Sequence, residues 1–290
     1  MSKLSNISVI KDVLTRHGFT FSKSLGQNFL VNPSVCPRMA ELGGAGVGVG
    51  VIEIGPGIGV LSEELALRAD KVVCIEIDKR LMPILDETLS EHNNIKIINN
   101  DVLDVDLHQL IKDEFEGMDV VVCANLPYYI TSPIIMHLLE SKLPIKRITV
   151  MVQKEAAQRI CALPATRDIG AITVAIRYYS EPHLLFNVSR GSFMPSPDVD
   201  SAVIALDILD KPSVDVKDEA TFFKVVKGGF SQRRKTLINC LSGFFSISKS
   251  NIGDMLESLD IKSTARAEEL TMQQFGLIAD KIFDYYSAEN

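Results

Sequence analysis

The stretch VIEIGPGIG, residues 51 to 59, decides the fold because it joins a strand to a glycine-rich turn. Its apolar beginning is typical of a buried strand, and glycines follow at positions 55, 57 and 59. Glycines after a first strand let backbone N–H groups approach a ligand at the start of the next helix. Residues 60–66, VLSEELA, continue with the periodicity of a helix. The stretch therefore predicts the opening strand, turn and helix of an α/β protein.

The same alternation of strand and helix patterns extends outward, from about residue 47 to residue 153. Near-continuous apolar runs are typical of parallel strands that are buried on both faces. Two later runs, HLLFNV (183–188) and SAVIALDI (201–208), predict an antiparallel pair at one edge of the sheet. We expect a Rossmann-like sheet with helices on both faces. The further strand runs are KVVCIEID (71–78), IKIINND (95–101), MDVVVCANL (118–126) and RITVMVQ (147–153).

The pattern changes after residue 210, where amphipathic helical segments are separated by Gly and Ser. A linker is expected at residues 210–213. The sequence thus predicts an α/β domain at 1–210 and a small all-α domain at 211–290.

Composition and charge narrow the class of protein. The chain has 290 residues, of which 46% are hydrophobic, and a net charge of −7. There is no run of eighteen apolar residues and no signal-peptide pattern, so we expect a cytoplasmic protein that does not span a membrane. The five cysteines are scattered and odd in number, which predicts buried, reduced thiols. No HExxH motif or Cys/His cluster occurs, so no metal site is expected, and the absence of heptads favours a monomer.

The glycine spacing indicates which cofactor the turn accepts. A dinucleotide site has the spacing G-x-G-x-x-G. Here Glu53, Gly55 and Gly57 begin the pattern E-x-G-x-G-x-G, which is found in methyltransferases that use S-adenosylmethionine, so these three residues are predicted to bind that cofactor. A tight turn that binds no ligand is the alternative for glycines alone.

Polar residues at the next strand ends favour the cofactor site. Glu76 ends the second strand, Asp101 follows the third, and Asn125 ends the fourth. Each acid alone is more often a surface residue or a helix cap. In an open α/β sheet, however, ligands bind beyond the carboxyl ends of the strands. We therefore expect Glu76 to hold the two ribose hydroxyls and Asp101 the adenine amino group, with both side chains outside the hydrophobic core.

The run NLPYY, residues 125–129, predicts the chemistry on the target side. The lone pair of an exocyclic adenine nitrogen is delocalised into the ring, so the amine is a poor nucleophile. If Asn125 and the backbone carbonyl of Leu126 or Pro127 accept its two hydrogens, the lone pair can turn toward a methyl donor. Tyr128 can stack on the base. A tyrosine that only packs in the core is the alternative for Tyr128.

Five motifs together resemble one family, the ribosomal RNA adenine-N6,N6-dimethyltransferases, and within it the bacterial small-subunit type. The resemblance covers about residues 20–285. It implies conversion of two adjacent adenosines near the 3′ end of 16S rRNA to N6,N6-dimethyladenosine, during maturation of the small ribosomal subunit. The motifs are LGQNFL (25–30), IEIGPGIGVLSEELA (52–66), NLPYYITSPI (125–134), SFMPSPDVDSAV (192–203) and FSQRRKTLIN (230–239).

The resemblance also implies roles for residues that spacing alone leaves unassigned. Asn28 and Leu30, in a segment 20–31, would close over the cofactor, and Gly55 would contact its methionine part. Asn125 would lie between the cofactor and the target and bind the cofactor as well. Phe193 would form the second face of an aromatic clamp on the target adenine. Two rivals stay open: an enzyme that methylates large-subunit rRNA and confers macrolide resistance, and an assembly factor of the same fold without turnover.

Basic residues are concentrated in spite of the acidic total. Residues 221–241 carry five Lys or Arg and no acid. A charge run is usually a solvated surface, here at the start of an expected helix. The resemblance places rRNA contacts nearby, so Arg233, Arg234 and Lys235 are predicted to bind phosphates.

Overall fold

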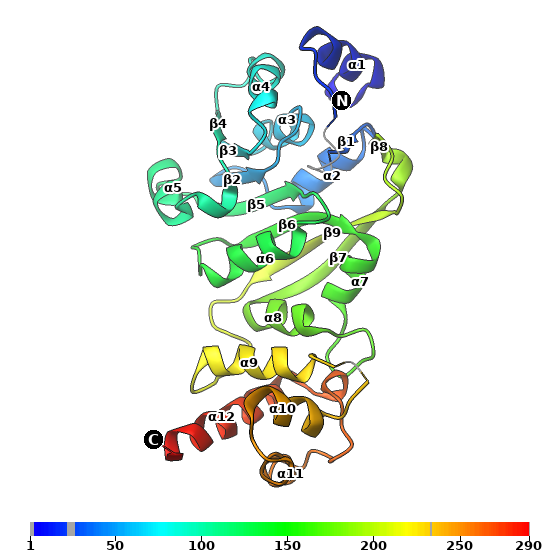
Figure 1. Ribbon diagram of the computed structural model, residues 1–290. Helices are drawn as coiled ribbons and strands as arrows, with labels where there is room; N and C mark the ends of the chain where they lie inside the picture. Colours follow the sequence, from blue (N-terminus) through cyan, green and yellow to red (C-terminus); the bar gives the residue numbers. More distant parts are fainter. Residues whose placement is uncertain (1–2, 22–26, 233, 290) are drawn as a thin grey trace. The chain divides into compact units, whose positions relative to one another are not determined.

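The computed structural model describes residues 3–21, 27–232 and 234–289 (Figure 1). The chain forms two compact units. The first unit contains residues up to Ala157 together with Pro182–Ile208, and the second contains Gln158–Glu181 together with the chain from Leu209 onward.

A seven-stranded sheet is the framework of the first unit, in the order β4-β3-β2-β5-β6-β9-β7. The five strands from β4 to β6 are parallel, and β9 is antiparallel to β6. The predicted Rossmann-like sheet is confirmed, and β9 and β7 lie at its edge as expected. The strands are β2 (Val49–Ile54), β3 (Lys71–Glu76), β4 (Ile95–Asn99), β5 (Asp119–Asn125), β6 (Arg147–Gln153), β7 (Ser180–Val188) and β9 (Ser201–Ile208).

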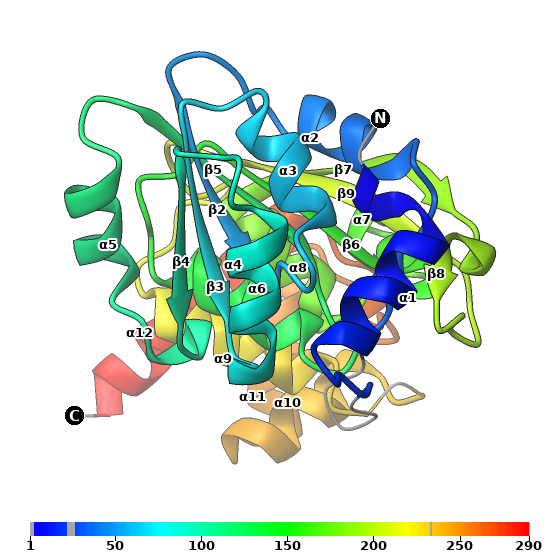
Figure 2. The ribbon, with the colours of Figure 1, turned by 90° about the horizontal axis from the view of Figure 1, so that it is seen from above.

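Helices cover both faces of this sheet (Figures 1 and 2). On one face, a core cluster joins four helices to alternate strand residues such as Val51, Val72 and Cys123. Their strand neighbours Ile52 and Val122 are fully buried on the opposite face. The first face carries α1 (Ile7–Arg16), α2 (Val35–Leu42), α3 (Val60–Ala66) and α4 (Met82–Thr88), and the second carries α5 (Leu107–Glu114) and α6 (Thr131–Glu140).

The parallel register brings the ends of four strands to one edge. Glu76 is opposite Asn99 in the β3–β4 pair, and β2 and β5 run side by side from Val49 to Ile54. The residues that follow β2, β3, β4 and β5 therefore emerge together.

A second, two-stranded sheet connects the beginning of the chain with a late segment. In it, β1 (Phe29–Leu30) is antiparallel to β8 (Phe193–Met194). The N–H of Val31 extends the pairing by donating to the carbonyl of Ser192 at 2.8 Å. The pairing places the N-terminal segment next to the segment that carries Phe193.

The second unit is helical and has an aromatic core. Phe222 and Phe275 are fully buried. Gly228 is necessary for close packing, because a Cβ there would lie 2.9 Å from the ring of Phe244. Its helices are α8 (Ala171–Tyr179), α9 (Glu219–Gly229), α10 (Leu237–Phe245), α11 (Lys249–Glu257) and α12 (Met272–Glu289), and α7 (Lys154–Cys161) begins in the first unit.

Residues 158–181 differ from the expected division, because they cluster with the C-terminal helices. The physical reason is aromatic packing: Tyr178 on α8 stacks on Phe222 of α9 with ring centroids 4.7 Å apart. The assignment of functional domains to 1–210 and 211–290 stays a prediction.

All five cysteines are free. Cys36, Cys74, Cys123 and Cys240 are buried as expected, whereas Cys161 is half-buried. Within the described residues, the structure contains no helix with the length and apolar character that a membrane span needs.

Candidate cofactor and substrate cleft

A cleft lies at the carboxyl ends of the parallel strands. The cleft is lined by most of the residues that were predicted from the sequence to bind the cofactor or the target. These residues come from distant parts of the chain. These residues are Asn28, Leu30, Gly55, Gly57, Glu76, Asp101, Asn125, Leu126, Pro127, Tyr128 and Phe193.

The glycine turn adopts a backbone that other residues rarely adopt. Gly55, Gly57 and Gly59 have φ angles of 69°, 61° and 91°. A Cβ on Gly55 would meet nothing within 4 Å, whereas a Cβ on Gly57 would lie 3.1 Å from the ring of Phe29. The turn therefore faces open space at Gly55 and is covered by the N-terminal segment at Gly57.

Glu76 joins the end of β3 to this turn. Its carboxylate accepts hydrogen bonds from the N–H groups of Asp78 at 2.8 Å and Gly57 at 3.3 Å. Glu76 is only 4% exposed, so the expectation that it lies outside the core is wrong. Burial raises the pKa of Glu76 to about 7, although backbone N–H donors, Asp78 and Gly57 foremost, oppose the shift.

Asp101 is half-buried at the end of β4, as expected of a residue outside the core. Its side chain accepts a hydrogen bond from the N–H of Leu103 at 3.0 Å and so caps the short helix that follows. A carboxylate has about four acceptor sites, so both Asp101 and Glu76 can still accept hydrogen bonds from a ligand.

Asn125 and the residues after it form the opposite wall of the cleft, between β5 and α6. Asn125 is half-buried, and Leu126 is buried. The carbonyl of Pro127 accepts from the N–H of Ile130 and from the hydroxyl of Thr131, each at 3.2 Å. These two bonds use both lone pairs of the Pro127 carbonyl.

Tyr128 is fixed by a residue that the sequence did not indicate. Its hydroxyl forms a 2.7 Å hydrogen bond with the hydroxyl of Ser201, which is fully buried at the start of β9. Burial raises the pKa of Tyr128. The ring therefore has a fixed position at the rim of the cleft.

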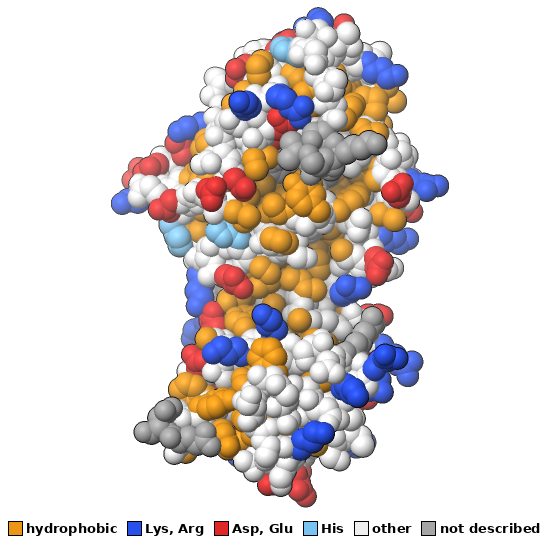
Figure 3. Space-filling view, in the orientation of Figure 1, with side chains coloured by type: hydrophobic (Ala, Val, Ile, Leu, Met, Phe, Trp, Pro, Cys, Tyr) orange, Lys and Arg blue, Asp and Glu red, His pale blue; other side chains and the backbone are white. Residues whose placement is uncertain are grey.

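Phe193 is 5% exposed and lies opposite Leu30 in the β1–β8 pair. The ring is thus part of the core and of the cleft wall at once. Exposed apolar side chains continue the wall outward, since Tyr129 is 61% exposed and Ile77 is 54% exposed. In the space-filling view, hydrophobic side chains gather across the first unit (Figure 3).

The structure does not bring Glu53 into the cleft. Glu53 shares its face of β2 with Val51, which packs in the core with α2 and α3, and its side chain is 1% exposed. The thiol of Cys74 donates a hydrogen bond to its carboxylate at 3.3 Å. Burial raises the pKa of Glu53 to about 7. Contact of this side chain with a cofactor, as predicted, would require it to leave the core.

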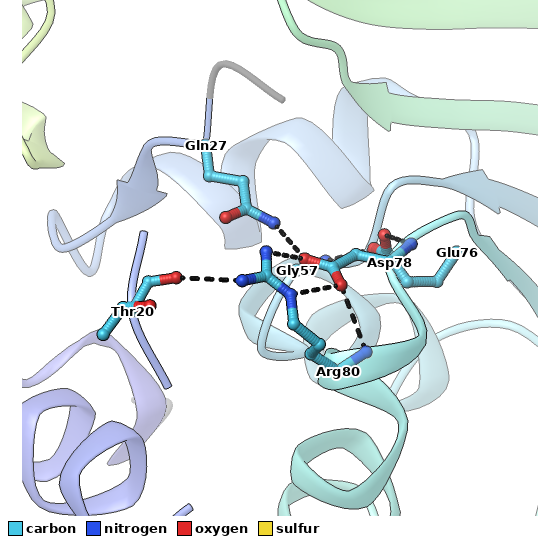
Figure 4. A network of polar contacts seen from close by, with 6 residues as sticks. All are labelled: Thr20, Gln27, Gly57, Glu76, Asp78 and Arg80. Carbon is cyan, nitrogen blue, oxygen red and sulfur yellow. Dashed lines mark hydrogen bonds and ion pairs between the residues drawn. The ribbon is translucent and has the colours of Figure 1, made fainter. Parts of the chain in front are cut away.

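A polar network next to the cleft was also absent from the sequence prediction (Figure 4). Asp78 accepts hydrogen bonds from Arg80 and from the amide of Gln27, and Arg80 also reaches the carbonyl of Thr20. The pair Asp78 and Arg80 is visible in the sequence as neighbouring charges. The contacts with Thr20 and Gln27 give no sequence signal, because they join distant segments.

The predicted basic segment lies in the second unit. Arg233 is outside the described residues. Arg234 and Lys235 are exposed, as are Lys224 and Lys227 on α9. The expected helix is wrong at Arg234 and Lys235, since they lie in a turn and α10 begins at Leu237 after the N-cap residue Thr236.

Residues 18–284 match the protein family described as "Ribosomal RNA adenine dimethylase". The protein "Ribosomal RNA small subunit methyltransferase A" of Alkaliphilus oremlandii (strain OhILAs) is 46% identical over 283 residues, which cover 97% of this chain and 99% of that protein. The protein of the same name from Geobacillus sp. (strain WCH70) is 48% identical over 276 residues, or 94% and 95% of the two chains.

Two solved structures have similar folds over most of the chain. The 23S rRNA methyltransferase ErmE is 26% identical, with a TM-score of 0.68, and the match covers 88% of this chain and 99% of that one. A dimethyladenosine transferase from Plasmodium falciparum is 24% identical, with a TM-score of 0.70 and coverage of 90% and 98%, and shows likeness of fold alone.

Proposed function

The chain belongs to the ribosomal RNA adenine dimethylase family, and on that premise we propose that its substrate is the RNA of the small ribosomal subunit. The protein is an rRNA adenine dimethyltransferase that uses S-adenosylmethionine. The proposed targets are two adjacent adenosines near the 3′ end of 16S rRNA, which become N6,N6-dimethyladenosine. We further propose that the enzyme acts as a monomer in the cytoplasm.

One observation carries the proposed site: acceptors for a nucleoside and the Asn-Leu-Pro-Tyr run face the same cleft. When bound, S-adenosylmethionine supplies a methyl group on a positively charged sulfur. The residues present fit this cofactor, because Gly55 leaves open space at the turn and Glu76 and Asp101 keep acceptor sites. Glu76 would accept from the ribose hydroxyls and Asp101 from the adenine amino group.

Asn125 and Leu126 would orient the target amine. The side-chain carbonyl of Asn125 and a backbone carbonyl accept the two hydrogens on N6, and the lone pair turns out of the ring plane. Since the carbonyl of Pro127 already accepts two hydrogen bonds, we assign the backbone role to Leu126. No general base is needed, because the nitrogen becomes acidic after methylation and then loses its proton.

Tyr128 and Phe193 would hold the target base by stacking. The bond between Tyr128 and Ser201 supports this role, because it fixes the ring without using the aromatic face. Asn28 and Leu30 would cover the cofactor, and Leu30 is already paired with Phe193. In the second unit, Arg234 and Lys235 are exposed and would contact RNA phosphates together with Arg233.

The test is methyl transfer from labelled S-adenosylmethionine to purified ribosomal subunits that lack the modification. Small subunits should accept label, and nuclease digestion should release N6,N6-dimethyladenosine. Label on large subunits instead would support the activity named for ErmE. No label on either subunit would favour an assembly factor without turnover.

A further inference from the structure

The polar network of Gln27, Asp78 and Arg80 beside the cleft indicates a role in cofactor binding, and this inference rests on the proposed function. We propose that Gln27, Asp78 and Arg80 form a clasp that positions the N-terminal segment bearing Asn28 and Leu30 against Glu76. By holding that segment over the cofactor, the clasp sets how long S-adenosylmethionine stays bound.

Asp78 is the centre of the clasp. Its carboxylate accepts from Nε of Arg80 at 2.8 Å, from Nη2 of Arg80 at 2.7 Å and from Nε2 of Gln27 at 2.8 Å. The side chain of Asp78 is only 4% exposed. The fork of two bonds from Arg80 fixes the carboxylate geometrically, and charge-assisted hydrogen bonds of this kind are among the stronger ones in proteins.

Arg80 attaches the clasp to a second point on the N-terminal segment. Its Nη1 donates to the carbonyl of Thr20 at 3.4 Å, and its guanidinium carbon lies 5.1 Å from the centroid of the Phe19 ring. The N-terminal part of the chain is therefore attached at two points, Thr20 and Gln27. Figure 4 shows both attachments converging on Asp78 and Arg80.

The clasp is continuous with the cofactor site through the backbone. The N–H of Asp78 donates to the carboxylate of Glu76 at 2.8 Å, and the other oxygen of Glu76 accepts from the N–H of Gly57. Two residues beyond Gln27, the ring of Phe29 covers Gly57. A shift of Asp78 would therefore disturb the predicted ribose acceptor and its cover together.

A surface ion pair would not have this effect. The bond between Gln27 and Asp78 joins residues that are 51 positions apart, and it is neither a helical neighbour contact nor fully exposed. A solvent-exposed pair typically contributes little, because water competes for both groups. The burial of Asp78 and its three bonds to side chains indicate a fixed position instead.

The test exchanges the amide and the carboxylate. Gln27→Glu places two carboxylates face to face, and Asp78→Asn removes the charge that binds Arg80. The double variant Gln27→Glu with Asp78→Asn restores one amide and one carboxylate in reversed order. Each single variant should raise the Kd for S-adenosylmethionine roughly three- to tenfold, mainly through a faster dissociation rate, and the double variant should recover most of that loss.

A matched control exists on α5. There Nε2 of Gln109 donates to Asp113 at 2.7 Å, in an exposed pair that does not line the cleft. The variants Gln109→Glu, Asp113→Asn and their double should all bind S-adenosylmethionine like the unchanged protein. Binding is measured by calorimetry and dissociation by stopped-flow, with a thermal melt of every variant.

Steady-state kinetics distinguish a clasp that positions the cofactor cover from residues that only stabilise the fold. Cofactor binding by the unchanged protein tests the proposed function separately. With small subunits as substrate, the single variants should raise the KM for S-adenosylmethionine while kcat changes less than about twofold. If Asp78→Asn does not fold, Gln27→Leu removes the same bond at a less buried position. Folded single variants with unchanged Kd, or a double variant without recovery, would overturn the clasp. If the unchanged protein does not bind S-adenosylmethionine, the proposed function itself fails.

Discussion

Leu30 and Phe193 lie opposite each other in the two-stranded sheet of β1 and β8. The segment proposed to cover the cofactor and the ring proposed to stack on the target base therefore share one pair of strands. A displacement of either strand would change both sides of the cleft. Because the two strands are paired, a substitution on one side of the cleft can affect the other. Cofactor binding, RNA binding and turnover therefore have to be measured separately for each variant.

Asp101→Ala should weaken S-adenosylmethionine binding by roughly 1 to 3 kcal/mol, because a donor of the cofactor loses its acceptor. The variant also loses the hydrogen bond from the N–H of Leu103, by which Asp101 caps the short helix that follows. Asp106→Ala is the matched control, since Asp106 caps α5 by accepting from Gln109 and does not line the cleft. Equal cofactor affinity of the two variants in calorimetry would contradict the assigned role of Asp101.

Asn125→Ala should lose most turnover and keep much of its RNA binding. The amide is proposed to orient N6 in the transition state, so its removal affects kcat more than substrate affinity. Single-turnover methylation of small subunits measures the first effect, and a filter-binding assay measures the second. A kcat within a few-fold of the unchanged enzyme would remove Asn125 from the mechanism.

Tyr128→Ala and Phe193→Ala should each weaken capture of the target base, where stacking contributes roughly 1 to 3 kcal/mol per base. Tyr128→Phe keeps the ring and loses only its bond to Ser201. Its effect should equal that of Ser201→Ala, and the double variant should be no worse than either, as measured by the KM for small subunits. Additive losses would show that the two hydroxyls act separately.

Arg234→Ala with Lys235→Ala should weaken subunit binding and flatten its salt dependence by about 0.7 to 0.9 log unit for each phosphate that the variant no longer binds. Affinity for S-adenosylmethionine should not change. Lys249→Ala with Lys262→Ala removes the same charge from exposed positions of the second unit and serves as the control. An unaltered salt slope in the Arg234 and Lys235 variant would exclude phosphate binding there.

Glu53→Gln should change how stability depends on pH. Burial raises the folded-state pKa of Glu53 to about 7, from an ordinary value of 4.5. Between these values the folded state binds more protons than the unfolded state, so stability is full at low pH and falls as pH rises toward 7. For such a shift in pKa, the free energy of unfolding falls by on the order of 3 kcal/mol across this pH range.

Urea unfolding at pH 5, 6, 7 and 8 measures that dependence. Glu53→Gln should reduce the fall in stability, and part of the fall should remain, because Glu76 has a pKa raised to about 7 as well. Glu116→Gln, at an exposed position, should keep the full dependence. A slope that is the same in the unchanged protein and in Glu53→Gln would show that Glu53 does not titrate in this range.

The sheet was largely predictable because its strands are apolar runs that end at recognisable turns. The order of helices and strands from β2 to β6 follows from alternation alone. Helices α1 and α2 lie outside that alternation, before residue 47, and were not predicted. Each strand can be predicted from its own short run of residues. The prediction is most reliable where the strand is buried on both faces, because such runs contain few polar residues.

Glu53 shows where motif reasoning failed. The motif places an acid before the glycines, but Glu53 lies inside β2, which is buried on both faces. A position within such a strand, before its carboxyl end, would have directed Glu53 to the core. The bonds from Gln27 to Asp78 and from Tyr128 to Ser201 had no comparable signal, because each joins segments whose proximity depends on the whole fold.

The setting of Glu53 has a chemical consequence for the thiols around it. Burial, and then the nearby Glu53 carboxylate, raise the pKa of Cys36, Cys74 and Cys123, the last to about 12. Thiolate is the form that reacts with alkylating agents and oxidants, so these three cysteines are inert while the chain is folded. Cys161 is only half-buried, and a thiol reagent should modify it first. Labelling of Cys36, Cys74 and Cys123 would then report opening of the core of the first unit, so the native thiols can serve as a probe of unfolding.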